Sequence, residues 1–463
     1  MELVRKLKKN PAECRVLVVG SAKSGFAALK LLRGMGAQVM LSEKSAESRL
    51  DPELRGWLQE NRVTYETGGH SLKLFLEADF IVVSPGVPLD MDELCAARAA
   101  GKEIIGELGL GAAFLDIPVI AVTGTNGKTT VTQLINDLLV FAGRKVFLGG
   151  NIGTPLTEYL LGEQDAEVAV LEVSSYQLDT AGNFRPSVAL LLNISPDHLD
   201  RYASYAEYAA SKMKIFFNQK PADAAILNVD DEETLRNLQN FRVESEKFWF
   251  GHKLDGRKGA MEGEREDEIV LCGAMEGEKY RLPESLVKSP NRENAMAAVL
   301  AARIMGCSPE SIQEGLLGFE RPAHRLYRVA EINGVTFIDD SKATNVGAVK
   351  SALDGMTKPV ILIAGGRDKG GDYRYLADSI RARVKKMVLI GEAGGKIAES
   401  LGGLTLIEMA ENLRDAVERA VRAAEPGDAV LLSPACASFD MFKSYADRGE
   451  KFQLEVKRLV ERG

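Results

Sequence analysis

The chain has 463 residues, and its 45% hydrophobic and 27% charged content is ordinary for a globular protein of about three domains, which excludes disordered and fibrous classes. A formal net charge of −8, from 58 basic and 66 acidic residues, does not suit a surface that binds nucleic acid or anionic lipid. The five cysteines are widely spaced without a C-x-x-C pair, and no apolar run reaches about 18 residues, so we expect no disulfide framework, no cysteine metal cluster and no membrane span in a soluble, cytoplasmic protein.

The first predicted domain, residues 1–106, begins with an apolar strand, a glycine-containing turn and a helical stretch. The strand covers Arg15–Val19, the turn Gly20–Gly25 and the helix Phe26–Arg33. This order predicts a Rossmann-like nucleotide-binding unit. The turn lacks the G-x-G-x-x-G spacing, but Glu43 ends the second strand, near where an acidic side chain would meet a ribose hydroxyl. By itself this pattern suits NAD as well as another nucleotide.

The second predicted domain, residues 107–321, contains a glycine loop between a strand and a helix. The strand is Pro118–Val122, the loop Gly124–Thr130, and apolar residues then recur at helical spacing until Gly143. Backbone N–H groups of such a loop, together with the helix N-terminus, attract phosphate charge. Val122 stands where the full G-x-x-x-x-G-K-[ST] pattern has its first glycine. With strand and helix in the right order, we still predict that this loop holds ATP.

Side chains in and beside the loop indicate phosphate and metal chemistry. Lys128 would reach the β- and γ-phosphates, and the Thr129 hydroxyl would ligate Mg²⁺. Glu172 and His198 each follow an apolar strand. Because the carboxyl ends of parallel strands point at the ligand crevice, these two residues favour a Mg²⁺ site beside the loop.

The third predicted domain, residues 322–463, alternates short apolar strands with helical stretches. Its strands are expected at Val335–Ile338, Val360–Ile363, Met387–Ile390 and Ala429–Leu432. This alternation predicts a second Rossmann-like unit. The fold class is therefore α/β, with N- and C-terminal Rossmann-like units flanking a central P-loop ATPase-type α/β domain.

Several segments of the chain resemble the signatures of the Mur ligases, the ATP-dependent enzymes that add amino acids in peptidoglycan synthesis. The segments are Gly124–Thr130, Gly150–Gly153, Leu171–Leu178, Asp197–Tyr202, Asn291–Ala295 and His324–Arg325. The resemblance covers essentially the whole chain, in order. It implies a first domain that binds UDP, a central domain that binds ATP and a third domain that binds the incoming amino acid.

Motifs in the third domain narrow this resemblance to one substrate. Asp339–Asn345, Leu432–Asp440 and Asp447–Phe452 are similar to the family members that add D-glutamate to UDP-N-acetylmuramoyl-L-alanine. Lys342 stands in a segment where other members and folylpolyglutamate synthase usually carry a histidine. The Asp-Asn-Pro-Arg motif of the diaminopimelate-adding member does not occur in the sequence.

The resemblance also implies a mechanism. ATP activates the substrate carboxylate as an acyl phosphate, the amine of D-glutamate attacks, and phosphate leaves. In the first step two anions, the substrate carboxylate and ATP, must approach each other. Catalysis is therefore expected to depend mainly on cationic side chains and two Mg²⁺ ions. The implied catalytic residues are Lys128, Glu172, His198 and Lys212, and the implied metal ligands are Thr129, Glu172, His198 and a carbamylated Lys212. Carbamylation would turn the Lys212 ammonium into an oxygen donor, which a hard cation prefers. A monomer is expected.

Substrate contacts follow from the resemblance residue by residue. The ATP set is Gly124, Thr125, Asn126, Gly127, Lys128, Thr129, Thr130, Asn294, Arg325 and Asp340. The UDP-muramoyl set is Ser21, Ala22, Glu43, Ser84, Gly86, Asn151 and Ser174. The D-glutamate set is Lys342, Thr344, Lys369, Ser438, Phe439 and Tyr445, in which lysines would pair with the two carboxylates. His324, beside Arg325, is interpreted as structural.

Three alternatives remain open from the sequence. The first is another Mur ligase or folylpolyglutamate synthase, which Lys342 argues against. The second is an oxidoreductase that binds NAD in its Rossmann-like units, which the missing G-x-G-x-x-G and the central phosphate loop argue against. The third is a non-catalytic nucleotide-binding module, which the set Lys128, Glu172, His198 and Lys212 argues against.

Overall fold

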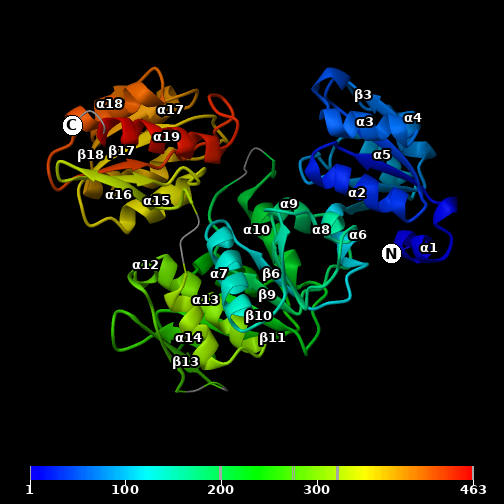
Figure 1. Ribbon diagram of the computed structural model, residues 1–463, viewed down its shortest axis with the longest axis horizontal. Helices are drawn as coiled ribbons and strands as arrows, with labels where there is room; N and C mark the ends of the chain where they lie inside the picture. Colours follow the sequence, from blue (N-terminus) through cyan, green and yellow to red (C-terminus); the bar gives the residue numbers. More distant parts are fainter. Residues whose placement is uncertain (1, 198–200, 274, 276, 320–322, 461–463) are drawn as a thin grey trace.

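The computed structural model describes residues 2–197, 201–273, 275, 277–319 and 323–460. In this part of the chain three separate β-sheets, each flanked by helices, form an α/β protein, which confirms the predicted fold class. Figure 1 shows the N-terminal unit in blue and the C-terminal unit in yellow to red on opposite sides above the central unit. Each predicted domain range contains one of the three sheets.

The N-terminal unit is a parallel sheet in the order β3-β2-β1-β4-β5. Its central strands are almost wholly apolar and buried, as a sheet covered by helices on both faces requires. The elements are α1 (Glu2–Lys9), β1 (Arg15–Val19), α2 (Lys23–Gly34), β2 (Gln38–Glu43), α3 (Pro52–Glu60), β3 (Thr64–Thr67), α4 (Leu72–Glu77), β4 (Phe80–Val83), α5 (Asp92–Ala99) and β5 (Glu103–Gly106). Helix α2 begins inside the predicted turn, because Gly25 lets the helix approach so closely that a Cβ there would lie 1.9 Å from the Gly20 carbonyl oxygen.

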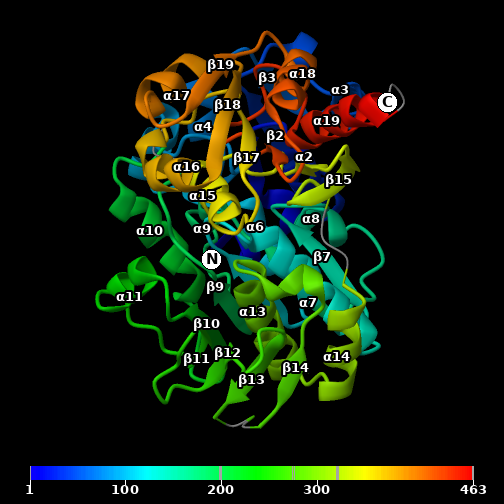
Figure 2. The ribbon, with the colours of Figure 1, turned by 90° about the vertical axis from the view of Figure 1, so that its left-hand side faces the viewer.

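The central unit has a sheet in the order β14-β13-β12-β11-β10-β9-β6-β8-β7. In this order the strands from β12 to β7, with β6 among them, run parallel. Strands β13 and β14 are antiparallel and lie at one edge. The strands are β6 (Val119–Thr123), β7 (Val146–Gly150), β8 (Val168–Glu172), β9 (Val188–Leu191), β10 (Ala224–Asn228), β11 (Glu246–Gly251), β12 (Gly259–Glu262), β13 (Glu268–Cys272) and β14 (Lys279–Arg281). The helices are α6 (Glu107–Ala112), α7 (Lys128–Phe141), α8 (Leu156–Tyr159), α9 (Ser175–Leu178), α10 (Tyr205–Met213), α11 (Glu232–Leu238), α12 (Glu284–Val287), α13 (Asn291–Ile304) and α14 (Pro309–Leu317). Helices α7 and α13 pack together over one face of this sheet, and Figure 2 shows them in front of it.

The C-terminal unit has a sheet in the order β15-β16-β20-β17-β18-β19, parallel except for the antiparallel edge strand β15. The elements are β15 (Tyr327–Ile332), β16 (Val335–Asp339), α15 (Val346–Asp354), β17 (Val360–Gly365), α16 (Ala377–Arg383), β18 (Val384–Ile390), α17 (Gly394–Leu401), β19 (Leu406–Met409), α18 (Leu413–Ala423), β20 (Ala429–Leu432) and α19 (Tyr445–Val460). Separate apolar clusters on the two faces of this sheet form its core.

The strands β11 to β14 were not expected from the sequence. They fall in the charged stretch 243–282, where the apolar runs are short. Strand β13 alternates half-buried and buried residues, so only one of its faces contributes to the core. Such a pattern gives a much weaker signal than the fully buried strands β6, β8 and β9.

The strand order places the predicted site at one edge of the central sheet. Strand β6 lies between β8 and β9, and all three run parallel. The loop after β6, Glu172 at the end of β8 and Asn193 after β9 therefore meet at the carboxyl edge, where ligands bind in open α/β sheets. In the described part of the chain, none of the helices combines the length and apolar character needed to cross a membrane.

Candidate active site

The loop between β6 and α7 has the backbone shape of a phosphate cradle. Gly124 and Gly127 have φ angles of +153° and +84°, which side-chain-bearing residues rarely adopt. A Cβ on Gly127 would lie 2.6 Å from the Asn294 Oδ1 atom, so the loop and α13 touch at this point. The Thr125 hydroxyl accepts from the Ser195 backbone N–H at 2.9 Å and fixes the other side of the loop. Contacts on both sides therefore fix the position of the loop.

Lys128 lies across this loop. Its Nζ atom donates to the carbonyl oxygens of Gly124 and Thr125, both at 2.8 Å. Burial lowers the pKa of the Lys128 ammonium, although the nearby carboxylates of Glu172 and Asp197 oppose the shift. The ammonium therefore occupies the side of the loop where a phosphate would bring negative charge.

Glu172 is the carboxylate at the centre of the site, and it is only 2% exposed. Its Oε2 atom accepts from the Thr129 hydroxyl at 2.7 Å, and its Oε1 atom accepts from Asn151 Nδ2 at 2.8 Å. Burial alone would raise the pKa of Glu172, but Lys128, Lys342 and these hydrogen bonds outweigh it and hold the pKa below its usual value. A carboxylate kept ionised beside a hydroxyl and an amide oxygen is a donor set that fits Mg²⁺.

Lys212 reaches the same loop from α10 and is 2% exposed. Its Nζ atom donates to the Gly124 carbonyl oxygen at 2.8 Å and lies 4.6 Å from the centre of the Tyr208 ring. Burial, reinforced by the charge of Lys128, lowers the pKa of the Lys212 amine well below its usual value. His198, the remaining predicted metal ligand, lies outside the described residues.

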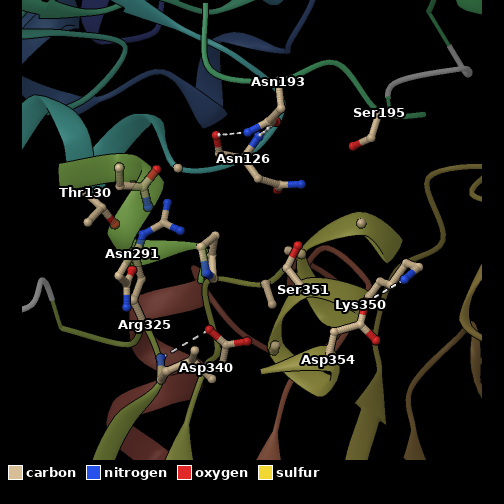
Figure 3. A pocket seen from close by; sticks show the side chains of 18 of the residues that line it. Asn126, Thr130, Asn193, Ser195, Asn291, Arg325, Asp340, Lys350, Ser351 and Asp354 are labelled. Carbon is tan, nitrogen blue, oxygen red and sulfur yellow. Dashed lines mark hydrogen bonds and ion pairs between the residues drawn. The ribbon is translucent and has the colours of Figure 1, made fainter. Parts of the chain in front are cut away.

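A cavity of about 300 Å³ opens between the loop and the C-terminal unit. Of the predicted ATP residues, it is lined by Asn126, Gly127, Thr130, Asn294, Arg325 and Asp340. Figure 3 shows Asn126 bonded to Asn193 on one side of this cavity and Arg325 and Asp340 on another. Ser351 and Asp354 of α15 border it from the C-terminal unit. The predicted nucleotide residues of two units therefore surround one space.

Arg325 and Asp340 are the predicted ATP residues that the C-terminal unit contributes to this cavity. Burial lowers the pKa of the Arg325 guanidinium, and its Nε atom is buried without a hydrogen-bond partner among the described residues. Burial raises the pKa of Asp340 to about 7, against a hydrogen bond of 2.8 Å from the Ser433 hydroxyl. An unsatisfied buried donor is unusual in a folded protein, and an anionic ligand would satisfy it. His324, beside Arg325, has φ +62°, and its Nδ1 atom shares a 2.6 Å hydrogen bond with the Asp339 Oδ2 atom, which agrees with a structural role.

The predicted D-glutamate residues lie on the carboxyl edge of the C-terminal sheet. The Lys342 Nζ atom lies 4.9 Å from the centre of the Tyr445 ring, and burial lowers the pKa of Lys342 to about 8. Ser438 is buried, whereas Phe439 beside it is 67% exposed. These four side chains lie on loops that follow β16 and β20 and at the first residue of α19.

Thr344 and Lys369 border a smaller pocket against the central unit. The Lys369 Nζ atom forms a 3.4 Å ion pair with Asp197, so in this arrangement its charge is partly neutralised by the protein itself. Asn345 donates to Asp197 at 2.9 Å and to the Asn126 Oδ1 atom at 3.3 Å. The C-terminal unit is thus joined to the phosphate loop by direct hydrogen bonds.

The predicted UDP residues of the first unit gather at the carboxyl edge of its sheet. Glu43 accepts from the backbone N–H groups of Ser21 at 2.7 Å and Ser45 at 2.8 Å, and these bonds hold its pKa below the usual value despite burial. The Ser84 hydroxyl donates to the Gly20 carbonyl oxygen at 3.1 Å. Glu43 and Ser84 therefore shape the two loops that would surround a nucleotide.

The remaining predicted UDP-muramoyl residues lie at helix starts and in loops. Ala22 is the N-cap residue of α2, and Gly86 is exposed in the loop after β4. Asn151 bonds Glu172, as described above, and Ser174 caps α9 in a reciprocal capping box with Gln177. The structure thus places Asn151 in contact with Glu172, and Ser174 two residues after Glu172 in the chain.

Sequence reasoning missed the residues that join the units. Asp197 receives Asn345 and Lys369 from the C-terminal unit. On the other side, Arg201 donates to the Val87 carbonyl oxygen at 2.6 Å and stacks over the Tyr176 ring at 4.1 Å. Asp197 and Arg201 stand in the segment Asp197–Tyr202 that resembles the family, but only the three-dimensional arrangement gives their partners.

Family models match most of the chain. A model described as Mur ligase MurD-like, N-terminal domain, matches residues 14–106. The Mur ligase middle domain matches residues 122–302, and the Mur ligase, glutamate ligase domain, matches residues 324–436.

Curated relatives align with the chain almost from end to end. The UDP-N-acetylmuramoylalanine–D-glutamate ligase of Desulfosudis oleivorans is 45% identical over 96% of this chain and 97% of the relative. The ligase of the same name from Desulfotalea psychrophila is 44% identical over 99% of both chains.

Solved structures share the fold at lower identity. A pseudomurein peptide ligase type C from Methanothermus fervidus superposes with a TM-score of 0.60 at 19% identity and covers 96% of this chain and 100% of its own. The UDP-N-acetylmuramate-alanine ligase MurC from Thermotoga maritima gives a TM-score of 0.57 at 18% identity, with 97% and 100% covered.

Proposed function

The chain belongs to the Mur ligase family, and on this premise we propose that it joins D-glutamate to UDP-N-acetylmuramoyl-L-alanine with consumption of ATP. The reaction forms an amide bond and releases ADP and phosphate, as a step of peptidoglycan precursor synthesis. The choice of amino acid is supported by relatives that are 44–45% identical and are named for D-glutamate.

One observation supports this chemistry most directly: cations of two units act on one buried carboxylate. Lys128 of the phosphate loop and Lys342 of the C-terminal unit both lower the pKa of Glu172. A phosphate held by Lys128 and an amino acid held by Lys342 would therefore meet beside this carboxylate. The ligase reaction requires this proximity, because the carboxyl group activated at the phosphate must come within reach of the amino-acid nitrogen.

We assign the steps to residues of this chain. The substrate carboxylate oxygen attacks the γ-phosphorus, the bond between the β-phosphate oxygen and that phosphorus breaks, and ADP leaves. Lys128, freed from the loop carbonyls, would bind the β- and γ-phosphates, and Arg325 would approach them from the C-terminal unit. Mg²⁺ held by Glu172 and the Thr129 hydroxyl would supply neutralising charge and polarise the phosphate oxygens.

The second half of the reaction takes place on the C-terminal side. The D-glutamate nitrogen, as the free amine, attacks the acyl-phosphate carbonyl carbon, the new C–N bond forms, the C–O bond to phosphate breaks, and one amine proton leaves with the phosphate. Lys342 and Lys369 would hold the two D-glutamate carboxylates as point charges. Lys369 would have to exchange Asp197 for the substrate, which its 3.4 Å ion pair allows. Tyr445, under the Lys342 ammonium, would keep that side chain directed into the pocket.

Lys212 is proposed to react with carbon dioxide and to act as a carbamate. Only the neutral amine attacks carbon dioxide, with loss of one proton, and burial lowers the pKa of Lys212 well below its usual value. The resulting carbamate would be an oxygen donor beside the Gly124 carbonyl group of the loop, and it would suit a second Mg²⁺ together with His198.

The proposal also includes the oligomeric state and the cellular location of the enzyme. As the family resemblance implies, we propose that the enzyme acts as a monomer. The five cysteines, none of them in a disulfide, suit a reducing cytoplasm, where ATP is available.

The deciding experiment measures phosphate release from ATP with Mg²⁺ and UDP-N-acetylmuramoyl-L-alanine. D-glutamate is compared with L-glutamate, L-lysine, meso-diaminopimelate and D-alanyl-D-alanine. We expect release with D-glutamate alone. Release with another amino acid instead would refute the substrate assignment, and no release with any of them would refute the ligase mechanism.

A further inference from the structure

Arg448 is fully buried near the start of α19 and has no role in the steps assigned above. It belongs to Asp447–Phe452, a segment that resembles the family without an assigned contact. A guanidinium is costly to remove from water unless its donors are satisfied. Its partners therefore show what the side chain stabilises.

Those partners are oxygens on two loops of the C-terminal sheet. The Arg448 Nε atom donates to Ser341 Oγ at 2.9 Å, and Nη2 donates to the Ser341 carbonyl oxygen at 2.8 Å. Nη1 is shared between the carbonyl oxygens of Cys436 at 3.2 Å and Ala437 at 3.4 Å. The two loops follow β16 and β20, which pair in parallel, and one planar side chain joins them.

A third loop is attached to the second. The backbones of Arg367 and Ala437 exchange hydrogen bonds of 2.9 and 3.1 Å. A Cβ on Gly366 would lie 3.2 Å from Arg448 Nη1, so this loop also passes beside the guanidinium. The loops carry, in order, the proposed D-glutamate residues Lys342 and Thr344, Ser438 and Phe439, and Lys369.

The remaining pocket residue is connected through the same serine. Ser341 Oγ, which accepts from Arg448, donates in turn to the Tyr445 carbonyl oxygen at 2.8 Å. The Tyr445 ring lies under the Lys342 ammonium. Each proposed D-glutamate residue therefore lies within three positions in the sequence of a residue that is bonded to Arg448, either directly or through one further hydrogen bond.

We propose that Arg448 is the positioning residue of the amino-acid pocket, which sets the relative placement of the three loops that bind the incoming amino acid. The proposal rests on the proposed function insofar as that amino acid is D-glutamate. Arginine suits the task because its donors are fixed in one plane and point in several directions. A lysine would keep the charge but would present its donors from a single atom, so it could hold one loop and release the other.

The test is the steady-state kinetics of Arg448→Lys. We expect the KM for D-glutamate to rise about tenfold or more, as the loss of hydrogen bonds to a charged group implies, while the KM values for ATP and the UDP substrate stay within about threefold. Arg458→Lys is the matched control on the same helix, since Arg458 is half-exposed and paired only with Glu455 in the described structure. Thermal unfolding and circular dichroism establish that both variants are folded.

An equal rise of all three KM values, or no change in the KM for D-glutamate, would overturn the proposal and leave Arg448 with a role in stability alone. If Arg448→Lys does not fold, Ser341→Ala replaces it, because it removes one partner and keeps the buried arginine. An unchanged KM for D-glutamate in Ser341→Ala would also overturn the proposal. If the wild-type enzyme uses another amino acid, the proposed function fails, and the same KM comparison is made with that amino acid.

Discussion

Gly127 and Gly143 stand at the two ends of α7 and allow the phosphate loop to be tested against a matched control. Both have a left-handed backbone, with φ angles of +84° and +79°. A Cβ on Gly143 would meet nothing within 4 Å, whereas a Cβ on Gly127 would lie 2.6 Å from Asn294 Oδ1 and 3.2 Å from Leu192 Cδ1. Substitution by alanine therefore adds the same backbone strain at both sites and a steric clash at only one.

The magnitudes follow from this difference. Left-handed backbone costs an alanine about 1–2 kcal/mol, so Gly143→Ala should lower the unfolding temperature of a domain of this size by roughly 2–8 °C. Gly127→Ala carries the same strain and must also displace Asn294, a residue that lines the nucleotide cavity. We expect Gly127→Ala to weaken ATP binding at least tenfold, or about 1.4 kcal/mol, and Gly143→Ala to leave it within about twofold.

Isothermal titration calorimetry with ATP and Mg²⁺ measures the affinity, and differential scanning calorimetry measures the stability of each variant. The reasoning is refuted if Gly127→Ala binds ATP as tightly as the wild type. It is refuted equally if Gly143→Ala loses as much affinity, because the effect would then come from strain in α7 and not from the loop.

Three further predictions concern charged groups of the site. Lys128→Met should lower the rate of phosphate release by about a thousandfold or more with the fold retained, whereas Lys145→Met, at an exposed surface lysine, should leave it unchanged; equal rates for the two variants would contradict the assignment. Lys212, whose neutral amine is favoured by burial, should give a carbamate carbon signal in an NMR spectrum recorded with ¹³C-labelled bicarbonate, and Lys212→Met should lack that signal; its absence from the wild type would count against carbamylation. Burial raises the pKa of Asp340 to about 7, far above about 3.9 in an unfolded chain, so the carboxyl group ionises first in the unfolded chain and the folded protein loses stability as the pH rises between these values. The stability of Asp340→Asn relative to the wild type should therefore increase from about pH 4 to about pH 7, and a pH-independent difference in unfolding temperature would disprove the shift.

The phosphate loop could be predicted because its determinants are contiguous in the sequence. An apolar strand, two glycines, a lysine and an amphipathic helix follow one another between Val119 and Phe141. Each of these features has a local physical cause, and the structure has the strand and the helix where the pattern indicates them. The strands β11 to β14 gave no such signal, because their apolar runs are short and, in β13, only one face is buried.

The contacts between the units, and those between the loops of the C-terminal unit, could not be predicted, because they join residues far apart in the sequence. Asn345 and Asp197 are 148 positions apart, and Arg448 lies 107 positions from Ser341. Neither pair has a sequence pattern of its own. The sequence also does not show that, of the neighbours Ser438 and Phe439, the first is buried and the second exposed. The path of the loop after β20 decides this.

The electrostatics of the site indicate why it needs its substrates. The pKa is lowered, first of all by burial, in each of Lys128, Lys212, Arg325 and Lys342. The charge of Lys128 also lowers the pKa of Lys212 and Lys342, and Glu172 opposes the shift in all of these groups. The fold thus holds its cations in surroundings that disfavour their charge until anions arrive. Phosphates and carboxylates would remove that electrostatic penalty, and this relief would contribute to the binding of ATP and the amino acid. The penalty exists only in the folded protein. These ligands should therefore bind the folded state alone and raise its stability.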